Sequence, residues 1–198
     1  MQVHVTGSKI HPIRTKAKQV NVTKQQTVQL TRKGGSAKAK ALLLSRKKNL
    51  PDGHPEIGDA MMDLAYDYSI ENRHGESLLM YAESVTFFKR VLREDDPKIG
   101  KSMFNLAYQC SQLGMYDEAL IIGKETLNFF KRVLPHNYYN IGRAMRNLSS
   151  VYVNLGRHQE ALKLLVQLLP IYERFLPPGD PKIDKIKSWI DKLQSDLH

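Results

Sequence analysis

Amide and positively charged side chains recur at matching positions of this chain and could bind a partner. Asn105 and Asn147 lie 42 residues apart, and a side-chain amide can both donate and accept hydrogen bonds, as an extended peptide backbone requires. Lys101, Arg143 and Arg146 lie within one helical turn of these asparagines. An arginine guanidinium binds a carboxylate through two parallel hydrogen bonds. These residues therefore indicate recognition of an acidic or mixed peptide.

The residue types that enzymes and metal sites use are not grouped in this way. The one cysteine, Cys110, shares its register with Tyr68 and Tyr152, so we expect a small buried residue and not a nucleophile. The histidines at positions 54, 74, 136 and 158 have no Cys or His at ligand spacing, and no glycine-rich phosphate loop occurs. We expect no catalytic, metal or cofactor site and predict that the protein is not an enzyme.

A repeat of 42 residues positions these side chains. Comparing the sequence with itself at this shift aligns a proline, an isoleucine, a leucine and a turn residue in successive units. The aligned sets are Pro55, Pro97 and Pro181; Ile57, Ile99, Ile141 and Ile183; Leu64, Leu106, Leu148 and Ile190; and Asn72, Gly114 and Gly156. Within each unit, apolar residues recur at helical spacing before and after the turn. Each unit is therefore predicted to be a pair of helices.

Proline and glycine indicate where these helices begin and end. Proline fits the first helical turn, where its missing N–H costs nothing, and glycine can adopt the left-handed conformation that ends a helix. The repeats are expected at 55–96, 97–138 and 139–180, with helix pairs at 55–71 and 76–92, 97–113 and 117–134, and 139–155 and 159–176. A capping helix is expected at 181–197. The expected fold class is all-α, a right-handed superhelix (α-solenoid) of stacked helix pairs.

The residues around the central turns resemble the tetratricopeptide repeat. The matching residues are Asn105-Leu106-Ala107, the run from Gly114 to Leu120, Phe129, and then Leu148, Tyr152, Gly156 and Ala161. The unit is longer than the usual length of about 34 residues, and with openings such as Asp96-Pro97 it is similar to the repeats of kinesin light chains. The resemblance covers about residues 54–190 and implies a protein-interaction adaptor or scaffold. Residues 1–50 lack the sustained heptads of the light chains' coiled coil.

In such a superhelix the first helix of each pair lines a concave groove, which can bind a peptide or a partner helix. Asparagines at the positions of Asn105 and Asn147 bind the ligand backbone in tetratricopeptide repeats generally, so the resemblance implies this role here. The expected groove residues are Lys101, Phe104, Asn105, Tyr108, Arg143, Arg146, Asn147 and Asn154, with Asp59, Met62, Asp63, Tyr66, Gln112 and Ser150 as further candidates. The alternative is that these residues form ordinary solvated helix faces.

The large aromatic residues are divided between the core and a candidate binding surface. Trp189 takes the register of Asn147 on the capping helix; packing against a neighbouring turn is the favoured interpretation, and a groove cap or an interface anchor is the alternative. The remaining aromatics at stacking positions are expected in the core: Tyr68, Phe87, Phe88, Phe129, Phe130 and Tyr152.

Positive charge is concentrated ahead of the repeats. The formal net charge is +10, and the first fifty residues contain twelve Lys or Arg and no Asp or Glu, which leaves 18 basic and 20 acidic residues elsewhere. Residues 1–35 are predicted to be a basic extended or disordered arm. Residues 36–50 are predicted to form an N-terminal helix that packs on the array, and residues 51–198 the repeat domain.

Three interpretations of the arm remain open: a solvated or partner-binding extension, a segment that binds an anionic surface, and a targeting peptide. Residues 1–50 contain no aromatic residue, so nucleic-acid binding by base stacking is not supported. The single cysteine and the lack of a secretory signal or a transmembrane run favour a cytoplasmic protein. The rival function is therefore a structural subunit that docks through its arm onto an assembly such as a cytoskeletal filament.

Overall fold

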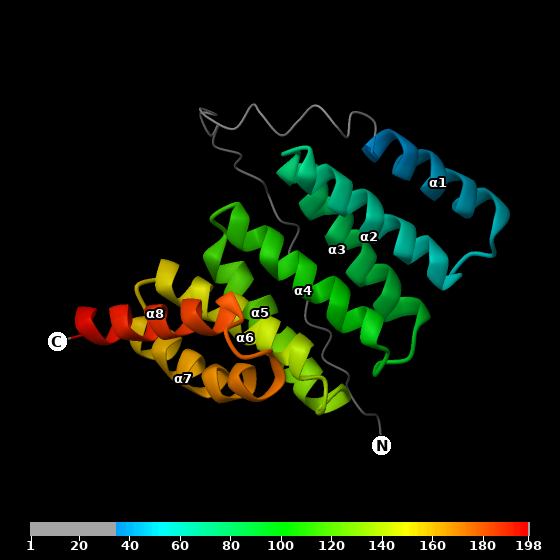
Figure 1. Cartoon of the computed structure of the whole chain (residues 1–198). Helices are drawn as coiled ribbons and strands as arrows, with labels where there is room; N and C mark the ends of the chain where they lie inside the picture. The colour runs from blue at the N-terminus through cyan, green and yellow to red at the C-terminus, as the bar shows by residue number, and fades with distance from the viewer. Residues whose placement is uncertain (1–34, 198) are drawn as a thin grey trace, which may run out of the picture. The chain divides into compact units, whose positions relative to one another are not determined.

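Eight helices follow one another along the part of the chain that the computed structural model describes, residues 35–197, and no strand lies among them. The helices are α1 (Gly35–Asn49), α2 (Pro55–Ile70), α3 (His74–Val91), α4 (Pro97–Gln112), α5 (Tyr116–Val133), α6 (Tyr138–Asn154), α7 (His158–Phe175) and α8 (Pro181–Asp196). Each helix packs against the next one, and α4 also contacts α6 (Figure 1). The expected all-α solenoid of helix pairs is confirmed. The second helix of each pair begins one or two residues earlier than expected.

The first helices begin with a short polar cap. Proline occupies the first turn of α2, α4 and α8. The carboxylates of Asp96 and Asp180 each accept a hydrogen bond of 2.8 Å from the backbone N–H two residues later. In α6, which lacks the proline, the Asn137 side chain accepts one of 3.1 Å from the N–H three residues later. Such caps stabilise a helix by about 0.5–2 kcal/mol because they satisfy N–H groups that have no partner inside the helix.

Each helix pair turns at a residue with positive φ. Gly114 and Gly156 have φ values of 74° and 69°, and Asn72 takes the same conformation with φ of 60°. In all three turns the N–H of the following residue bonds to the carbonyl five residues earlier, at 2.8–2.9 Å. This pattern closes the end of the first helix. Asparagine tolerates the left-handed region better than most side chains, which explains why it can replace glycine in the first unit.

A glycine on the first helix of each pair faces an aromatic ring on the second helix. These glycine–aromatic pairs are Gly58 with Phe88, Gly100 with Phe130, and Gly142 with Tyr172. A methyl group added to any of the three glycines would lie only 2.5–2.6 Å from a ring carbon of its partner. The absence of a side chain therefore lets the two helices approach until the ring packs directly on the backbone of the first helix.

The residues that align at the 42-residue shift form the interior of the stack. Leu64, Leu106, Leu148 and Ile190 are each at most 9% exposed, and the six aromatic residues expected in the core are also buried. Cys110 is buried among them. The helical spacing in the sequence thus identified the packed faces correctly, because a repeated unit buries the same positions each time it stacks.

Helix α1 covers the first helix pair at the start of the array. Its Leu43 is buried, and both the backbone N–H and the hydroxyl of Ser36 donate to the carboxylate of Glu71, at 3.1 and 2.6 Å. These hydrogen bonds lower the pKa of the Glu71 carboxyl. The arm predicted at residues 1–35 lies outside the described residues, except for Gly35, which begins α1.

Helix α8 packs on α7 through one apolar stripe. Ile183, Ile186, Ile190 and Leu193 are buried. The rest of the helix is largely polar and exposed. None of the helices between residues 35 and 197 is both long and apolar enough to cross a membrane.

Candidate functional site

A groove follows the first helices of the pairs. Its lining comes from α2, α4, α6 and α8, with one residue from α3, and it holds about 420 Å³ of open space. Fifteen residues line it: Tyr66, Ser69, Tyr81, Phe104, Asn105, Tyr108, Gln109, Ser111, Gln112, Arg143, Arg146, Asn147, Ser150, Lys185 and Trp189. Helices that are 42 residues apart in sequence thus present their matching positions to one space.

Six of the eight expected groove residues lie in this lining. They are Phe104, Asn105, Tyr108, Arg143, Arg146 and Asn147. Three of the further candidates, Tyr66, Gln112 and Ser150, line it as well. At the register of the asparagines, Asn105, Asn147 and Trp189 line the groove, whereas Asp63 of the first repeat does not.

Two of the eight expected residues lie outside the lining. Lys101 is exposed on α4 one turn before Asn105, and Asn154 lies at the end of α6, where its amide donates to the Ser150 carbonyl of its own helix at 2.8 Å. Three further candidates are also outside it: Asp59, Met62 and Asp63. Met62 is buried in the core, and Asp59 pairs with Lys98 at 2.8 Å. These five residues therefore lie on the helices that line the groove, but their side chains are not part of its lining.

Two guanidinium groups dominate the charge of the groove. Arg143 lies over the rings of Phe104 and Tyr139, with its guanidinium carbon 4.4 and 5.5 Å from the ring centroids. Among the described residues neither Arg143 nor Arg146 has a carboxylate within 4.0 Å. Cation–π contacts hold a guanidinium in place but leave its N–H groups available. Both charges can therefore be used by a ligand.

Sequence reasoning missed Gln109, which is fully buried and also lines the groove. Its amide nitrogen lies 3.0 Å from Nδ1 of His74, and its amide oxygen has no hydrogen-bond partner among the described residues. A signal was present, because Gln109 shares its register with Val151. A buried polar atom without a hydrogen-bond partner calls for an explanation, and a ligand in the groove could supply that partner.

The last helix contributes two residues to the groove. Trp189 is half-buried, packs against the hydrophobic core and also lines the groove. Lys185 lies one turn earlier, with its ammonium nitrogen 5.5 Å from the Trp189 ring centroid. The groove therefore ends on an aromatic ring and a third positive charge.

Two titratable residues of the interior have raised pKa values. Burial raises the pKa of the Cys110 thiol to about 11, so at neutral pH it is protonated and a poor nucleophile. Burial likewise raises the pKa of Tyr81 to about 12. Between residues 35 and 197 no three His, Cys, Asp or Glu side chains are grouped so that they could hold a metal ion.

Comparison with protein families gives a match in the central part of the array. Residues 99–174, which include most of α4 to α7, match the model of the tetratricopeptide repeat. These residues are tetratricopeptide repeats. The expected resemblance to the tetratricopeptide repeat is thus confirmed in these residues. A search of curated proteins found no match to the sequence.

Solved structures of tetratricopeptide-repeat proteins share the fold. One contains nearly identical TPR-like repeats of a kinesin light chain from Podosopora anserina, with a TM-score of 0.70 and 19% identity over 81% of this chain and 76% of that one. Another is BtubC (BKLC) from P. vanneervenii, with a TM-score of 0.73 and 21% identity over 82% of this chain and 66% of that one. At these identities the likeness concerns the fold. It confirms the similarity to kinesin light chain-like repeats.

Proposed function

We propose that the protein is an adaptor or scaffold that binds an extended, acidic or mixed segment of a partner protein in the groove of its tetratricopeptide repeats. The observation that carries the proposal is the charge of the groove. Its fifteen lining residues include three cations, Arg143, Arg146 and Lys185, and no carboxylate. An unbalanced positive groove favours a ligand that supplies negative charge.

The amides of the groove can hold the backbone of such a segment. Asn105 and Asn147 are half-buried in matching positions of α4 and α6, and neither side chain has a hydrogen-bond partner among the described residues. An amide presents both a donor and an acceptor, which matches the N–H and C=O of one peptide residue. The exposed rings of Tyr66 and Tyr108, 55% and 46% exposed, can cover apolar side chains of the ligand.

The first test replaces the polar groups of the groove. Peptides are selected from a phage-displayed random library on the full chain, and their affinities are measured by fluorescence polarisation. We expect Asn105→Ala with Asn147→Ala, and separately Arg143→Ala with Arg146→Ala, to weaken binding at least about tenfold, because a neutral hydrogen bond contributes about 0.5–1.5 kcal/mol and one to a charged group about 1.5–3 kcal/mol. Selected peptides should be rich in Asp and Glu.

The matched control for this test is Lys101→Ala, since this lysine lies on the same helix as Asn105 but outside the groove. It should change affinity less than twofold at physiological salt, where exposed charges are screened. Circular dichroism should show unchanged helicity in every variant. Equal affinity of the wild type and both double variants would rule out the groove as the binding site.

A second candidate function is that of a structural subunit that docks through the basic segment before α2. One observation favours it: the first fifty residues contain twelve basic and no acidic residues. The full chain is compared with a chain lacking residues 1–34 in co-sedimentation with microtubules over a salt series. Charge-driven docking predicts that the full chain sediments at low salt, that sedimentation falls steeply as salt rises, and that the shortened chain stays in solution. Equal sedimentation of the two chains would exclude this function. A cytoplasmic, cytoskeleton-associated location belongs to the same proposal.

A further inference from the structure

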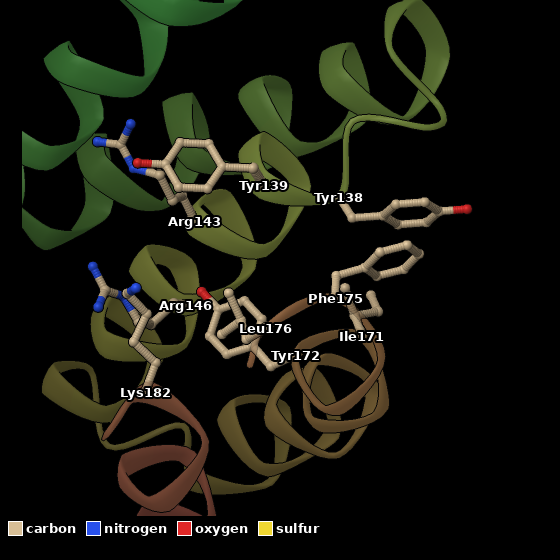
Figure 2. A pocket seen from close by; sticks show the side chains of 9 residues that line it. All are labelled: Tyr138, Tyr139, Arg143, Arg146, Ile171, Tyr172, Phe175, Leu176 and Lys182. Atoms are coloured by element: carbon tan, nitrogen blue, oxygen red, sulfur yellow. The ribbon is translucent and has the colours of Figure 1, made fainter. Parts of the chain in front are cut away.

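A second cavity lies between the start of α6, the end of α7 and the start of α8. It encloses about 180 Å³, and Figure 2 shows its lining side chains. We refer to it as the α6–α8 pocket. It shares only Arg143 and Arg146 with the groove described above. The groove and the pocket are therefore neighbouring spaces separated by two arginines.

Aromatic side chains form much of the wall of the α6–α8 pocket. Tyr139 projects from α6 and is 64% exposed, whereas Tyr172 from α7 is buried. At the outer edge Tyr138 and Phe175 stack on each other, with ring centroids 4.0 Å apart and an angle of 15° between the rings. This stack ties the start of α6 to the end of α7. A space bordered by such rings suits another flat ring, which can pack on their faces and edges.

Three cations border the same pocket. Arg143 and Arg146 come from α6 and Lys182 from α8, and in Figure 2 the charged ends of all three are directed to the same side. One carboxylate lies nearby: Asp180 caps α8 through Oδ1, and its Oδ2 lies 3.5 Å from the Lys182 ammonium. The three positive charges and this one negative charge leave an excess of two. A doubly charged anion would neutralise the pocket.

A phenol donor faces the same place. Burial raises the pKa of the Tyr172 hydroxyl, although the positive charges of Arg146 and Arg143 act to lower it. The hydroxyl is therefore protonated at neutral pH and can donate a hydrogen bond to an anion. Tyr172 lines the same pocket as the two arginines.

We propose that the α6–α8 pocket binds the side chain of a phosphorylated tyrosine, with the aromatic ring against Tyr139 and Tyr172 and the phosphoryl group on Arg143, Arg146 and Lys182. A phosphoryl group carries about −1.5 to −2 charges at pH 7 and three strong acceptor oxygens, and arginine binds it bidentately. Aspartate and glutamate carry one charge and no ring, and phosphoserine has no ring. The inference rests on the proposed function, because a peptide in the groove would deliver this side chain past the shared arginines.

The test uses small probes and the full chain, so it does not require a peptide ligand. N-acetyl-phosphotyrosine amide, N-acetyl-phosphoserine amide, N-acetyl-tyrosine amide and inorganic phosphate are titrated by isothermal calorimetry, and contacts are mapped by amide chemical shifts. We expect the phosphotyrosine probe to bind at least about tenfold more tightly than the other three, with the largest shifts in residues 138–146 and 171–182. Equal binding of the phosphoserine or phosphate probe, or no saturable binding, would overturn the proposal.

Substitutions can distinguish binding in the pocket from a general attraction of anions to positive charge. Lys182→Gln, which affects the pocket alone, should weaken the phosphotyrosine probe at least fivefold, and the matched change Lys185→Gln in the groove should leave it within twofold. Equal losses in these two variants would contradict the assignment. The variants at Asn105 and Asn147 affect the groove alone. Loss of library peptides in those variants without any binding of the phosphotyrosine probe would retain the groove function and exclude this inference.

Discussion

Replacing Phe88 with alanine is expected to lower the free energy of unfolding by roughly 3–5 kcal/mol. Phe88 is completely buried, and its ring packs on the backbone of α2 at Gly58. Glycine has no side chain that could move into the space left by the ring, so the substitution leaves a cavity and removes the contact between the two helices of the first pair. A domain of this size is stabilised by only about 5–15 kcal/mol in total.

Chemical denaturation followed by circular dichroism measures this loss. The matched control is Phe175→Ala, because Phe175 is 46% exposed and its main partner is the stacked ring of Tyr138. An aromatic pair contributes about 0.5–1.5 kcal/mol beyond its buried area, so the control should lose clearly less than Phe88→Ala. A loss at Phe88 no greater than that at Phe175 would show that the ring does not hold the helix pair together.

Replacing Gly100 with alanine is expected to destabilise the protein by roughly 1–3 kcal/mol, the usual range for overpacking. The direction is opposite to that of helix propensity, in which alanine is favoured over glycine by about 1 kcal/mol. The added methyl carbon would lie 2.6 Å from ring atoms of both Phe129 and Phe130, and both rings are buried, so neighbouring side chains restrict their movement. The two helices of the second pair would therefore have to separate.

Gly75→Ala is the matched control for this change. Gly75 is also helical, in the first turn of α3, but no atom lies within 4 Å of the place where its methyl carbon would be. Alanine there should leave stability unchanged or raise it slightly. The midpoints of urea denaturation of the two variants and the wild type provide the measurement. If Gly100→Ala were as stable as Gly75→Ala, the close approach of α4 and α5 would have no energetic role.

The fold could be predicted from the sequence because the same unit occurs three times. A single apolar stripe leaves the neighbouring helix undetermined, but recurrence at 42 residues showed that Leu64, Leu106 and Leu148 occupy equivalent interfaces. The turn residues gave the helix ends for a local physical reason, which is the positive φ at Asn72 and its two equivalents. The exact start of each second helix was missed by one or two residues, because helix ends depend on local fraying and capping.

The groove was only partly predictable. Asn105, Asn147 and the two arginines lie in the groove lining, but Lys101, which shares the register of Arg143, and Asp63, which shares that of Asn105, lie outside it. Whether a residue at the edge of the lining face enters the groove depends on a rotation of less than one helical turn, which explains the misplacement of Lys101. The α6–α8 pocket could not be predicted, because it depends on how the end of α7 packs beside the starts of α6 and α8 and not on the repeat pattern.

The position of Arg143 and Arg146 in the wall between the groove and the α6–α8 pocket couples the two spaces. An anion that recruits these guanidiniums on one side reduces the positive potential available on the other side, so the free energies of occupying the two spaces are not additive. By linkage, each occupant changes the affinity of the other by the same factor. In a peptide that spans both spaces the second contact is intramolecular, and its raised effective concentration offsets this competition. The protein can therefore discriminate between ligands by their length as well as by their charge.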